Sequence, residues 1–296
     1  MKRDKARLLF ATAIFGTLGL VRRYIPLSSA MIALVRGAVG VAFLLAVHGC
    51  RRQRFDRAAI RQNWWRLLLS GALIGANWIC LFEAYRYTTV SVASVCYYMA
   101  PVFVLLASPL VLHERMTLQQ GICAAVAVCG MVLVSGVPEN GFSGLRGIAY
   151  GLAAAAMYAT VILLNKCIRG MTDIDRTILQ LGVTALTLLP YVLLTEDLSA
   201  IRLTLPTGAL LLLAGVLHTG IAYVLYFGSA HRLPAQTVAI FSYIDPVTAV
   251  LLSVLVLREP VSVPVILGIL LVIGAAVVGE LPLHRTGPNA KKEDAE

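Results

Sequence analysis

The chain repeats part of its own sequence after 145 residues, and this repeat constrains the fold more than any other feature. Tyr98–Val102 reads YMAPV and Tyr243–Val247 reads YIDPV, and an aliphatic run ending in glutamate follows each segment. The same offset, without a gap, pairs Gly75 with Gly220, Phe82 with Phe227, Tyr98 with Tyr243, Pro101 with Pro246, Ser108 with Ser253 and Glu114 with Glu259. Because matched Gly, Phe, Tyr, Pro and Glu rarely coincide in one frame, we expect a duplicated structural unit.

The composition indicates a membrane protein. Hydrophobic residues make up 59% of the 296 residues and charged residues only 14%, whereas a soluble domain carries about 25% charged residues. Apolar runs of about 20 residues are long enough to cross a bilayer. We count ten such runs, at about 6–22, 29–49, 66–87, 91–112, 117–136, 145–167, 175–195, 206–229, 235–257 and 261–280. The expected fold class is therefore an all-α polytopic membrane protein with ten transmembrane helices.

The positive charges predict the orientation of these helices. If the N-terminus is cytoplasmic, 18 Lys and Arg residues fall on cytoplasmic segments and 6 on the opposite side. This bias follows the positive-inside rule. The net charge of +10 thus fits short cytoplasmic loops near membrane lipid, and no nucleic-acid partner is expected. We expect a multi-pass protein of the plasma membrane with both termini in the cytoplasm.

The repeat and the helix count together predict an inverted architecture. The offset covers five helices, an odd number, so the second half enters the membrane in the opposite sense. We expect one five-helix repeat at 1–137, a second at 138–282 and a polar cytoplasmic tail at 283–296. Inverted repeats are common in secondary transporters, whose substrate site lies near the membrane midplane between the halves.

With these features the chain resembles the drug/metabolite transporter superfamily, in its EamA-type ten-helix branch. The resemblance rests on Arg36, on Ala100–Glu114, on Asp245–Glu259 and on the glycine-rich stretch after each glutamate. It covers nearly the whole chain and implies a central cavity built mainly from helices 1, 3, 4, 6, 8 and 9. Such families move amino acids, nucleosides, sugars, vitamins or cationic drugs, so the resemblance leaves the substrate open.

Two prolines lie in the middle of expected spans, Pro101 and Pro246. Each removes an intrahelical hydrogen bond and kinks or breaks its helix. The freed carbonyl is tolerated in a membrane only against protein or a water-filled cavity. Their symmetric placement favours a hinge or gate over a simple packing kink. Tyr98 and Tyr243 precede the prolines on the same helix face, and we expect both to line a cavity, although tyrosine also serves as a packing residue.

Asp245 is the least expected residue, because it stands where the first repeat has Ala100. A carboxylate inside an apolar span costs roughly 2.5–3.5 kcal/mol on insertion scales and therefore faces a cavity or a partner. It either contacts a cation, an amine or a proton, or it forms a structural pair, for example with Arg36. For Arg36 itself a structural role is expected. Glu83 has Arg86 three residues later, so a local ion pair is expected there.

Other polar and aromatic side chains within the spans are expected to face the interior. The predicted substrate-binding residues are Asn77, Trp78, Tyr98, Tyr158, His218, Tyr223, Tyr243 and Asp245. His218 could carry a proton, but a lone membrane histidine is more often a hydrogen-bonded structural residue.

No cofactor, metal or enzymatic activity is expected. The six cysteines show neither CxxC nor Cys/His spacing. The chain contains no HExxH, GxSxG or nucleotide-binding loop.

The sequence favours a secondary transporter that exports a small metabolite by alternating access. Tyrosines recur along the expected interior faces, which favours amino acids or flat organic solutes as substrates, with amino acids preferred. The alternative is an exporter of cationic drugs driven by proton antiport, in which Asp245 serves both proton and drug. A membrane enzyme and a non-transporting receptor are the remaining classes, and transport by the purified protein would distinguish them from a transporter.

Overall fold

The computed structural model describes residues 2–88, 90–113, 117–134, 144–197, 203–258 and 262–280. Every regular element within these ranges is helical. The expected boundary between repeats at 137/138 and the tail at 283–296 lie outside the described residues.

Long apolar helices dominate the described part of the chain. Six helical segments are long and apolar enough to cross a membrane: Ser29–Cys50, Arg57–Tyr87, Val92–Val111, Leu145–Cys167, Asp173–Thr195 and Leu205–Arg232. Shorter apolar helices cover Leu118–Leu133 and Val263–Ala275. The predicted all-helical, multi-pass membrane protein is thereby confirmed.

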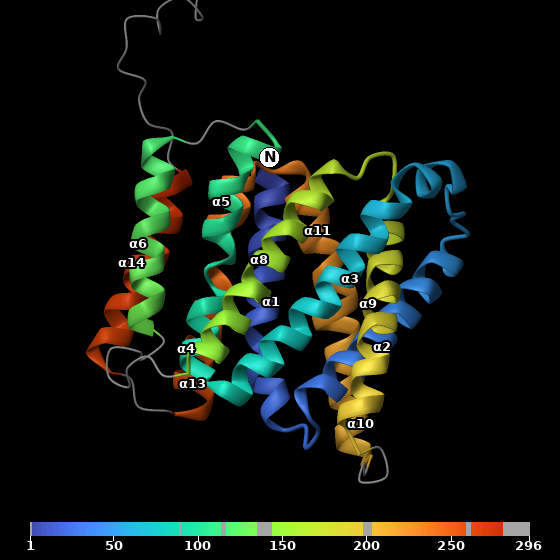
Figure 1. Ribbon diagram of the computed structural model, residues 1–296, viewed down its shortest axis with the longest axis horizontal. Coiled ribbons are helices and arrows are strands. Elements are labelled where there is room, and N and C mark those ends of the chain that lie inside the picture. The colour runs from blue at the N-terminus through green and yellow to red at the C-terminus, as the bar shows by residue number, and fades with distance from the viewer. Residues whose placement is uncertain are drawn as a thin grey trace, which may run out of the picture.

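The elements follow one another along the chain with short connections (Figure 1). They are α1 (Lys2–Arg23), α2 (Ser29–Cys50), α3 (Arg57–Tyr87), α4 (Val90–Tyr97), α5 (Ala100–Val111), α6 (Leu118–Val134), α8 (Leu145–Cys167), α9 (Asp173–Thr195), α10 (Leu205–Leu213), the π-helix η2 (Ala214–Ile221), α11 (Ala222–Arg232), α12 (Ala235–Phe241), α13 (Ile244–Leu257) and α14 (Val263–Glu280).

The long helix α3 begins at Arg57, whereas the apolar run predicted a helix that begins at about residue 66. Asp56 caps it by accepting hydrogen bonds from the backbone N–H groups of Ala58 at 2.9 Å and Ala59 at 3.1 Å. An N-cap aspartate satisfies backbone donors that a helix start leaves unpaired. The basic residues that follow Asp56 therefore lie on a helix instead of in a loop.

Three of the apolar stretches form interrupted helices. The backbone leaves the α-helix between α4 and α5 and again between α12 and α13. Between α10 and α11 the chain forms the π-helix η2, where the Thr219 hydroxyl donates to the carbonyl of Ala214, five residues earlier, at 3.1 Å. Such interruptions within membrane helices often mark functional sites.

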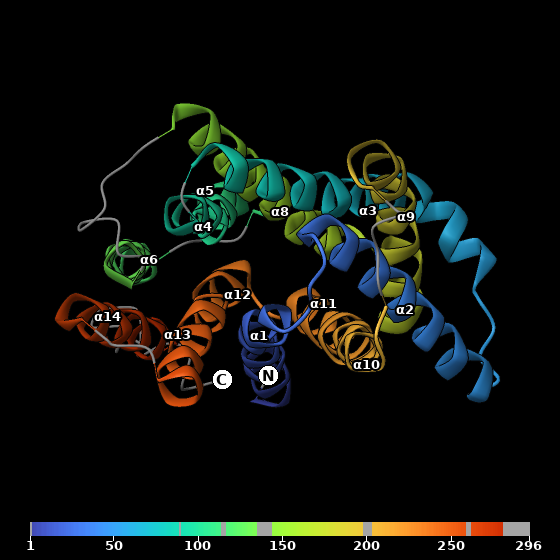
Figure 2. The same ribbon diagram turned by 90° about the horizontal axis from the view of Figure 1, so that it is seen from below.

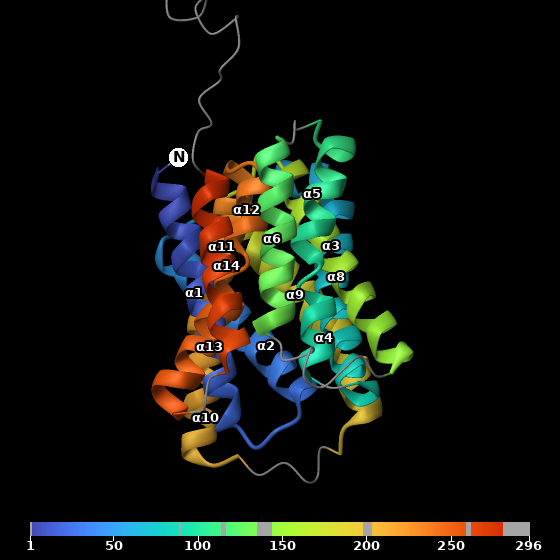
Figure 3. The same cartoon turned by 90° about the vertical axis from the view of Figure 1, so that its left-hand side faces the viewer.

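The helices stand side by side, and the start of α1 and the end of α14 lie at the same end of the bundle (Figure 1). The α1–α2 connection lies at the opposite end. Seen along the helices, α1 stands between α11 and the α12–α13 pair (Figure 2). Helices α6 and α14 pack against each other at one edge of the bundle (Figures 2 and 3).

Close helix contacts depend on glycines, most clearly at Gly71 where α3 meets α9. A Cβ atom at Gly71 would lie 2.6 Å from the Gln180 carbonyl oxygen and 2.6 Å from the Val183 Cβ. Thr184 donates to the Gly71 carbonyl at 2.9 Å, which fixes the same contact. Small residues that let backbones approach are typical of membrane helix interfaces.

We predict that Gly71→Ala destabilises the protein by about 1–3 kcal/mol, because the added methyl group overpacks this contact. Gly182→Ala on α9 is the matched control, since a Cβ there meets no atom within 4 Å. Thermal unfolding in detergent measures both variants. Equal melting temperatures for the two would contradict the proposed close contact.

Candidate functional site

A cavity of about 340 Å³ lies within the helix bundle. Its lining extends from buried Tyr226, 1% exposed, to Arg22 at the exposed end of α1. The cavity therefore opens toward the α1–α2 connection, away from the end that holds the start of α1. Six of the predicted substrate-binding and hinge residues line it: Trp78, Tyr98, Pro101, Tyr158, Tyr223 and Asp245.

The remaining predicted substrate-binding residues, Asn77, His218 and Tyr243, lie outside the cavity lining. Asn77 is fully buried and donates to the carbonyl of Ala154 at 2.6 Å, which joins α3 to α8. His218 is 1% exposed, and its Nε2 lies 2.7 Å from the Thr17 hydroxyl. Tyr243 is buried in a separate apolar cluster beside α6 and α14.

The two prolines mark the two breaks beside the cavity. Pro101 lies in the first turn of α5 and Pro246 in the first turn of α13. A proline cannot donate to the carbonyl four residues earlier, which belongs to Tyr97 in one case and Ser242 in the other. Both of those residues line the cavity, so the expected helix breaks occur where the backbone meets open space. Pro246 itself is not part of the lining.

Asp245 is partly buried and contributes a carboxylate to the cavity. Among the described residues it has no ion-pair partner, and the pair with Arg36 considered from the sequence is not formed. The phenols of Tyr97, Tyr98 and Tyr223 lie close enough to interact with it electrostatically. A carboxylate in this position is available to a ligand.

Arg36, for which the sequence favoured a structural role, also lines the cavity. It is 9% exposed, and its guanidinium lies over the Trp78 ring with its central carbon 4.1 Å from the ring centroid. A cation over an indole face is stabilised by the ring quadrupole. The sequence signal was present, because a lone arginine within an apolar run faces a cavity or a partner.

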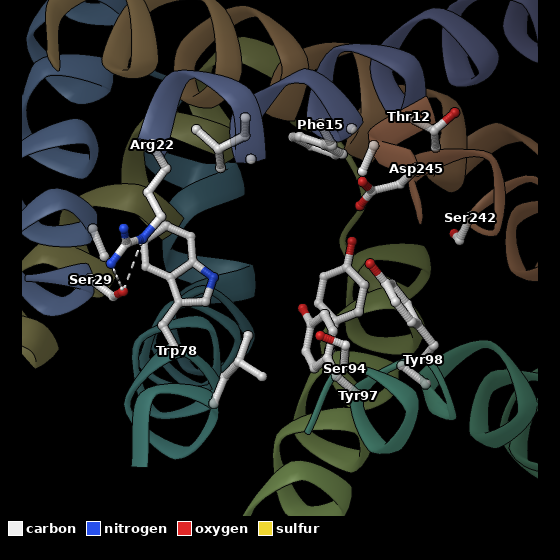
Figure 4. A pocket seen from close by; sticks show the side chains of 18 of the residues that line it. Thr12, Phe15, Arg22, Ser29, Trp78, Ser94, Tyr97, Tyr98, Ser242 and Asp245 are labelled. Atoms are coloured by element: carbon white, nitrogen blue, oxygen red, sulfur yellow. Dashed lines mark hydrogen bonds between the residues drawn. The ribbon is translucent and has the colours of Figure 1, made fainter. Parts of the chain in front are cut away.

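Several other lining residues were missed because they sit at span ends or lack a distinctive neighbour. Arg22, at the end of the apolar run 6–22, donates through Nε and Nη2 to the Ser29 hydroxyl at 3.3 and 3.0 Å. Figure 4 shows Arg22, Ser29 and Trp78 on one side of the cavity, facing Asp245 and Tyr98 on the other. No periodicity in the chain brings these segments together.

Aromatic rings form a continuous wall of the cavity. Tyr223 contacts the rings of Phe15 and Trp78, with centroids 5.3 and 6.2 Å apart. Tyr158 contacts Tyr97 and Tyr226, with centroids 5.9 and 6.3 Å apart. Aromatic pairs at such distances add stability beyond their buried area, so this wall is a rigid surface for an apolar group.

At the opposite end of the bundle, outside the cavity lining, charged side chains form a group of ion pairs, here called the ionic cluster. Asp173 of α9 pairs with Arg176 at 3.0 Å and with Arg232 of α11 at 2.6 Å. Arg232 also reaches Asp4 of α1 at 3.6 Å. Along α1, fully buried Leu8 stands between Asp4 of this cluster and Thr12 of the cavity lining. These ion pairs join α1, α9 and α11 at this end of the bundle.

Glu83 forms the local ion pair expected from the sequence. Its carboxylate lies 3.0 Å from Arg86 and accepts a hydrogen bond from the Tyr191 hydroxyl at 2.7 Å. This carboxylate is satisfied by protein groups, in contrast to Asp245. The part of the chain that the structure describes contains no cluster of His, Cys, Asp and Glu suited to a metal ion.

The sequence matches the EamA-like transporter family model twice, over residues 7–136 and 145–278. An uncharacterized transporter of Bacillus subtilis, YxxF, is 28% identical over 258 residues, which cover 83% of this chain and 79% of that protein. Protein PecM of Dickeya dadantii is 28% identical over 217 residues, covering 72% and 73% of the two chains. Protein RarD of Salmonella typhi is 30% identical over 192 residues, covering 64% and 62%.

A solved crystal structure, described only as that of a protein, shares the fold. It superposes with a TM-score of 0.81 over 94% of this chain and 97% of that chain, at 18% identity. The family match, the transporter relatives and the membrane-spanning helices agree with one another. The chain belongs to the EamA-like transporter family and is a multi-pass membrane transporter of small molecules.

Proposed function

We propose that this protein is a secondary transporter that exports amino acids across the plasma membrane by alternating access. Ten transmembrane helices form two inverted five-helix repeats, at 1–137 and 138–282, with both termini and the tail at 283–296 in the cytoplasm. The substrate binds in the cavity between the repeats, and protons are the candidate coupling ion.

Three observations support this architecture. The family model matches the chain in two successive blocks, 7–136 and 145–278. The helix breaks before Pro101 and Pro246 occur at related positions of the two blocks. The start of α1 and the end of α14 lie at the same end of the bundle, as an even number of spans requires.

The observation that carries the proposal is a cavity open at one end, with an unpaired carboxylate inside. Alternating access requires that the closed end opens while the open end closes. The closed end is held by the ionic cluster of Asp4, Asp173, Arg176 and Arg232, and salt bridges of this kind can re-form in a second state. With cytoplasmic termini, the cavity faces the cell exterior in this structure.

The size and charge of the cavity favour an amino acid over a cationic drug, the alternative substrate. At about 340 Å³ the cavity lies at the small end of the range for small-molecule pockets, about 300–1,000 Å³. It contains the cation of Arg36 as well as the carboxylate of Asp245. A drug that carries only positive charge gains nothing from Arg36.

Blocking the cavity tests whether it is the transport path. Gly19 lines the cavity, and a Cβ at this position meets no atom within 4 Å. We expect Gly19→Phe to reduce amino-acid counterflow in proteoliposomes by about tenfold or more, because the ring occupies the substrate path. Since the ring enters open space, the melting temperature in detergent should change little.

Gly182→Phe is the matched control, because Gly182 also has open space at its Cβ but does not line the cavity. This variant should retain counterflow. Counterflow that survives Gly19→Phe would refute the proposed transport path. Absence of counterflow with every amino acid in a broad panel would refute the proposed substrate.

A further inference from the structure

We infer that the cavity recognises its substrate by both charges at once, with the substrate carboxylate at Arg36 and the ammonium group at Asp245. The substrate class is then the zwitterionic α-amino acid with an uncharged side chain. This inference rests on the proposed function and narrows it, because it excludes amines and carboxylic acids that carry only one of the two charges.

The Arg36 side chain is built as an anion subsite. Trp78 covers one face of the guanidinium at 4.1 Å, and no carboxylate among the described residues pairs with it. Arg36 also lines the cavity, and the planar edge of its guanidinium carries N–H donors. That edge matches a carboxylate through two parallel hydrogen bonds.

Arg22 is the other cation in the cavity lining, but it is less suited to this role. Two of its nitrogens already donate to the Ser29 hydroxyl, and the residue is exposed at the mouth. Arg36 is 9% exposed and lies deeper along α2. A buried cation without a counter-ion attracts an anion more strongly than a solvated cation does, because water screens the charge of the solvated cation.

Asp245 provides the complementary subsite for the ammonium group. It sits in the first turn of α13, next to the helix break at Ser242. Tyr97 and Tyr98 lie near its carboxylate and offer ring faces and hydroxyl groups to an ammonium ion. An ammonium ion bound there is therefore both paired and shielded from water.

The two subsites act together, because each charge is costly to bury alone. Truncating one partner of a buried charge pair weakens binding, largely because the other charge is then left buried and unpaired. A ligand with one charge leaves Arg36 or Asp245 unpaired in the closed cavity. An amino acid pairs with both, and its side chain then meets the wall around Tyr158 and Tyr223.

Two matched sets of probes test this inference on the unmodified protein. The first set is L-phenylalanine, 2-phenylethylamine and 3-phenylpropionate, and the second is L-leucine, 3-methylbutylamine and 4-methylpentanoate. Each set keeps one apolar body and presents both charges, the ammonium alone or the carboxylate alone. Competition against counterflow of the labelled amino acid and thermal stabilisation in detergent give two independent readouts. We expect at least one of the two amino acids to bind about tenfold or more tightly than either of its singly charged analogues.

Substitution of Arg36 assigns the carboxylate subsite. Arg36→Gln should bring the amino acid and its amine to similar affinities, while Arg36→Lys, which keeps the charge, should retain part of the preference. An amine that competes as well as its amino acid on the unmodified protein would overturn the inference while leaving transport intact. Absence of counterflow and of stabilisation by every amino acid would instead refute the proposed function itself.

Discussion

Asp245→Asn is expected to lower amino-acid counterflow roughly 100-fold or more and to leave the protein as stable as before, or more stable. The substitution keeps the shape of the side chain and removes its charge. The loss of transport follows because the substrate ammonium group loses its counter-ion in a cavity of low dielectric constant, at a cost of about 2–5 kcal/mol. The gain in stability follows because the carboxylate has no ion-pair partner among the described residues, so its burial opposes folding.

Glu83→Gln is the matched control, because Glu83 is also a carboxylate within a membrane-spanning helix. Its charge is paired with Arg86 and bonded to Tyr191, and it does not line the cavity. The neutral variant should lose stability and keep transport, the reverse of Asp245→Asn. If Asp245→Asn transported normally and melted at a lower temperature, Asp245 would be a structural carboxylate.

The same contrast explains why the ion pair of Glu83 was predictable from the sequence and a partner for Asp245 was not. Glu83 has Arg86 one turn later, and helical spacing alone brings the two together. Asp245 has no charged neighbour at helical spacing, and its partner could only come from another helix or from a ligand. The repeat strengthened this interpretation, since Ala100 occupies the related position and shows that the repeated unit does not require a carboxylate.

Much of the fold was predictable because apolar runs and prolines act locally. The helix breaks at Pro101 and Pro246 follow from a missing backbone donor. The early start of α3 was missed because its first turns carry charged residues, although the cap at Asp56 was a readable signal. The π-helix η2 was not predictable, since it depends on packing of Gly215 and Gly220 against Val39 and Phe43 of α2.

The kinds of residue that line the site were predictable, but which individual residues line it was less so. Trp78, Tyr98, Tyr158, Tyr223 and Asp245 line the cavity, as polar or aromatic side chains within apolar helices should. Asn77, His218 and Tyr243 have the same character and face other helices instead. Which face of a helix meets the cavity depends on how the helices rotate in the bundle, and a single sequence contains no record of that rotation.

Asp173→Asn is expected to destabilise the protein by about 3 kcal/mol and to loosen the closed end of the bundle. Asp173 is the carboxylate that holds both Arg176, whose side chain is 1% exposed, and Arg232. Breaking a buried ion pair from one side costs about 3–5 kcal/mol because a charge remains buried without compensation. The value lies at the low end because the asparagine oxygen still accepts one hydrogen bond.

The same substitution at another helix start gives the control for Asp173→Asn. Asp56 caps α3 through its oxygen, and asparagine caps a helix about as well as aspartate, so Asp56→Asn should leave the melting temperature almost unchanged. Hydrogen–deuterium exchange measures the loosening of this end of the bundle. Asp4 joins the first turns of α1 to Arg232, so amides there should exchange faster in Asp173→Asn but not in Asp56→Asn. Under the proposed alternating access, faster exchange there marks opening of this end of the bundle. Unchanged exchange together with normal counterflow would show that the ionic cluster stabilises the fold without gating it.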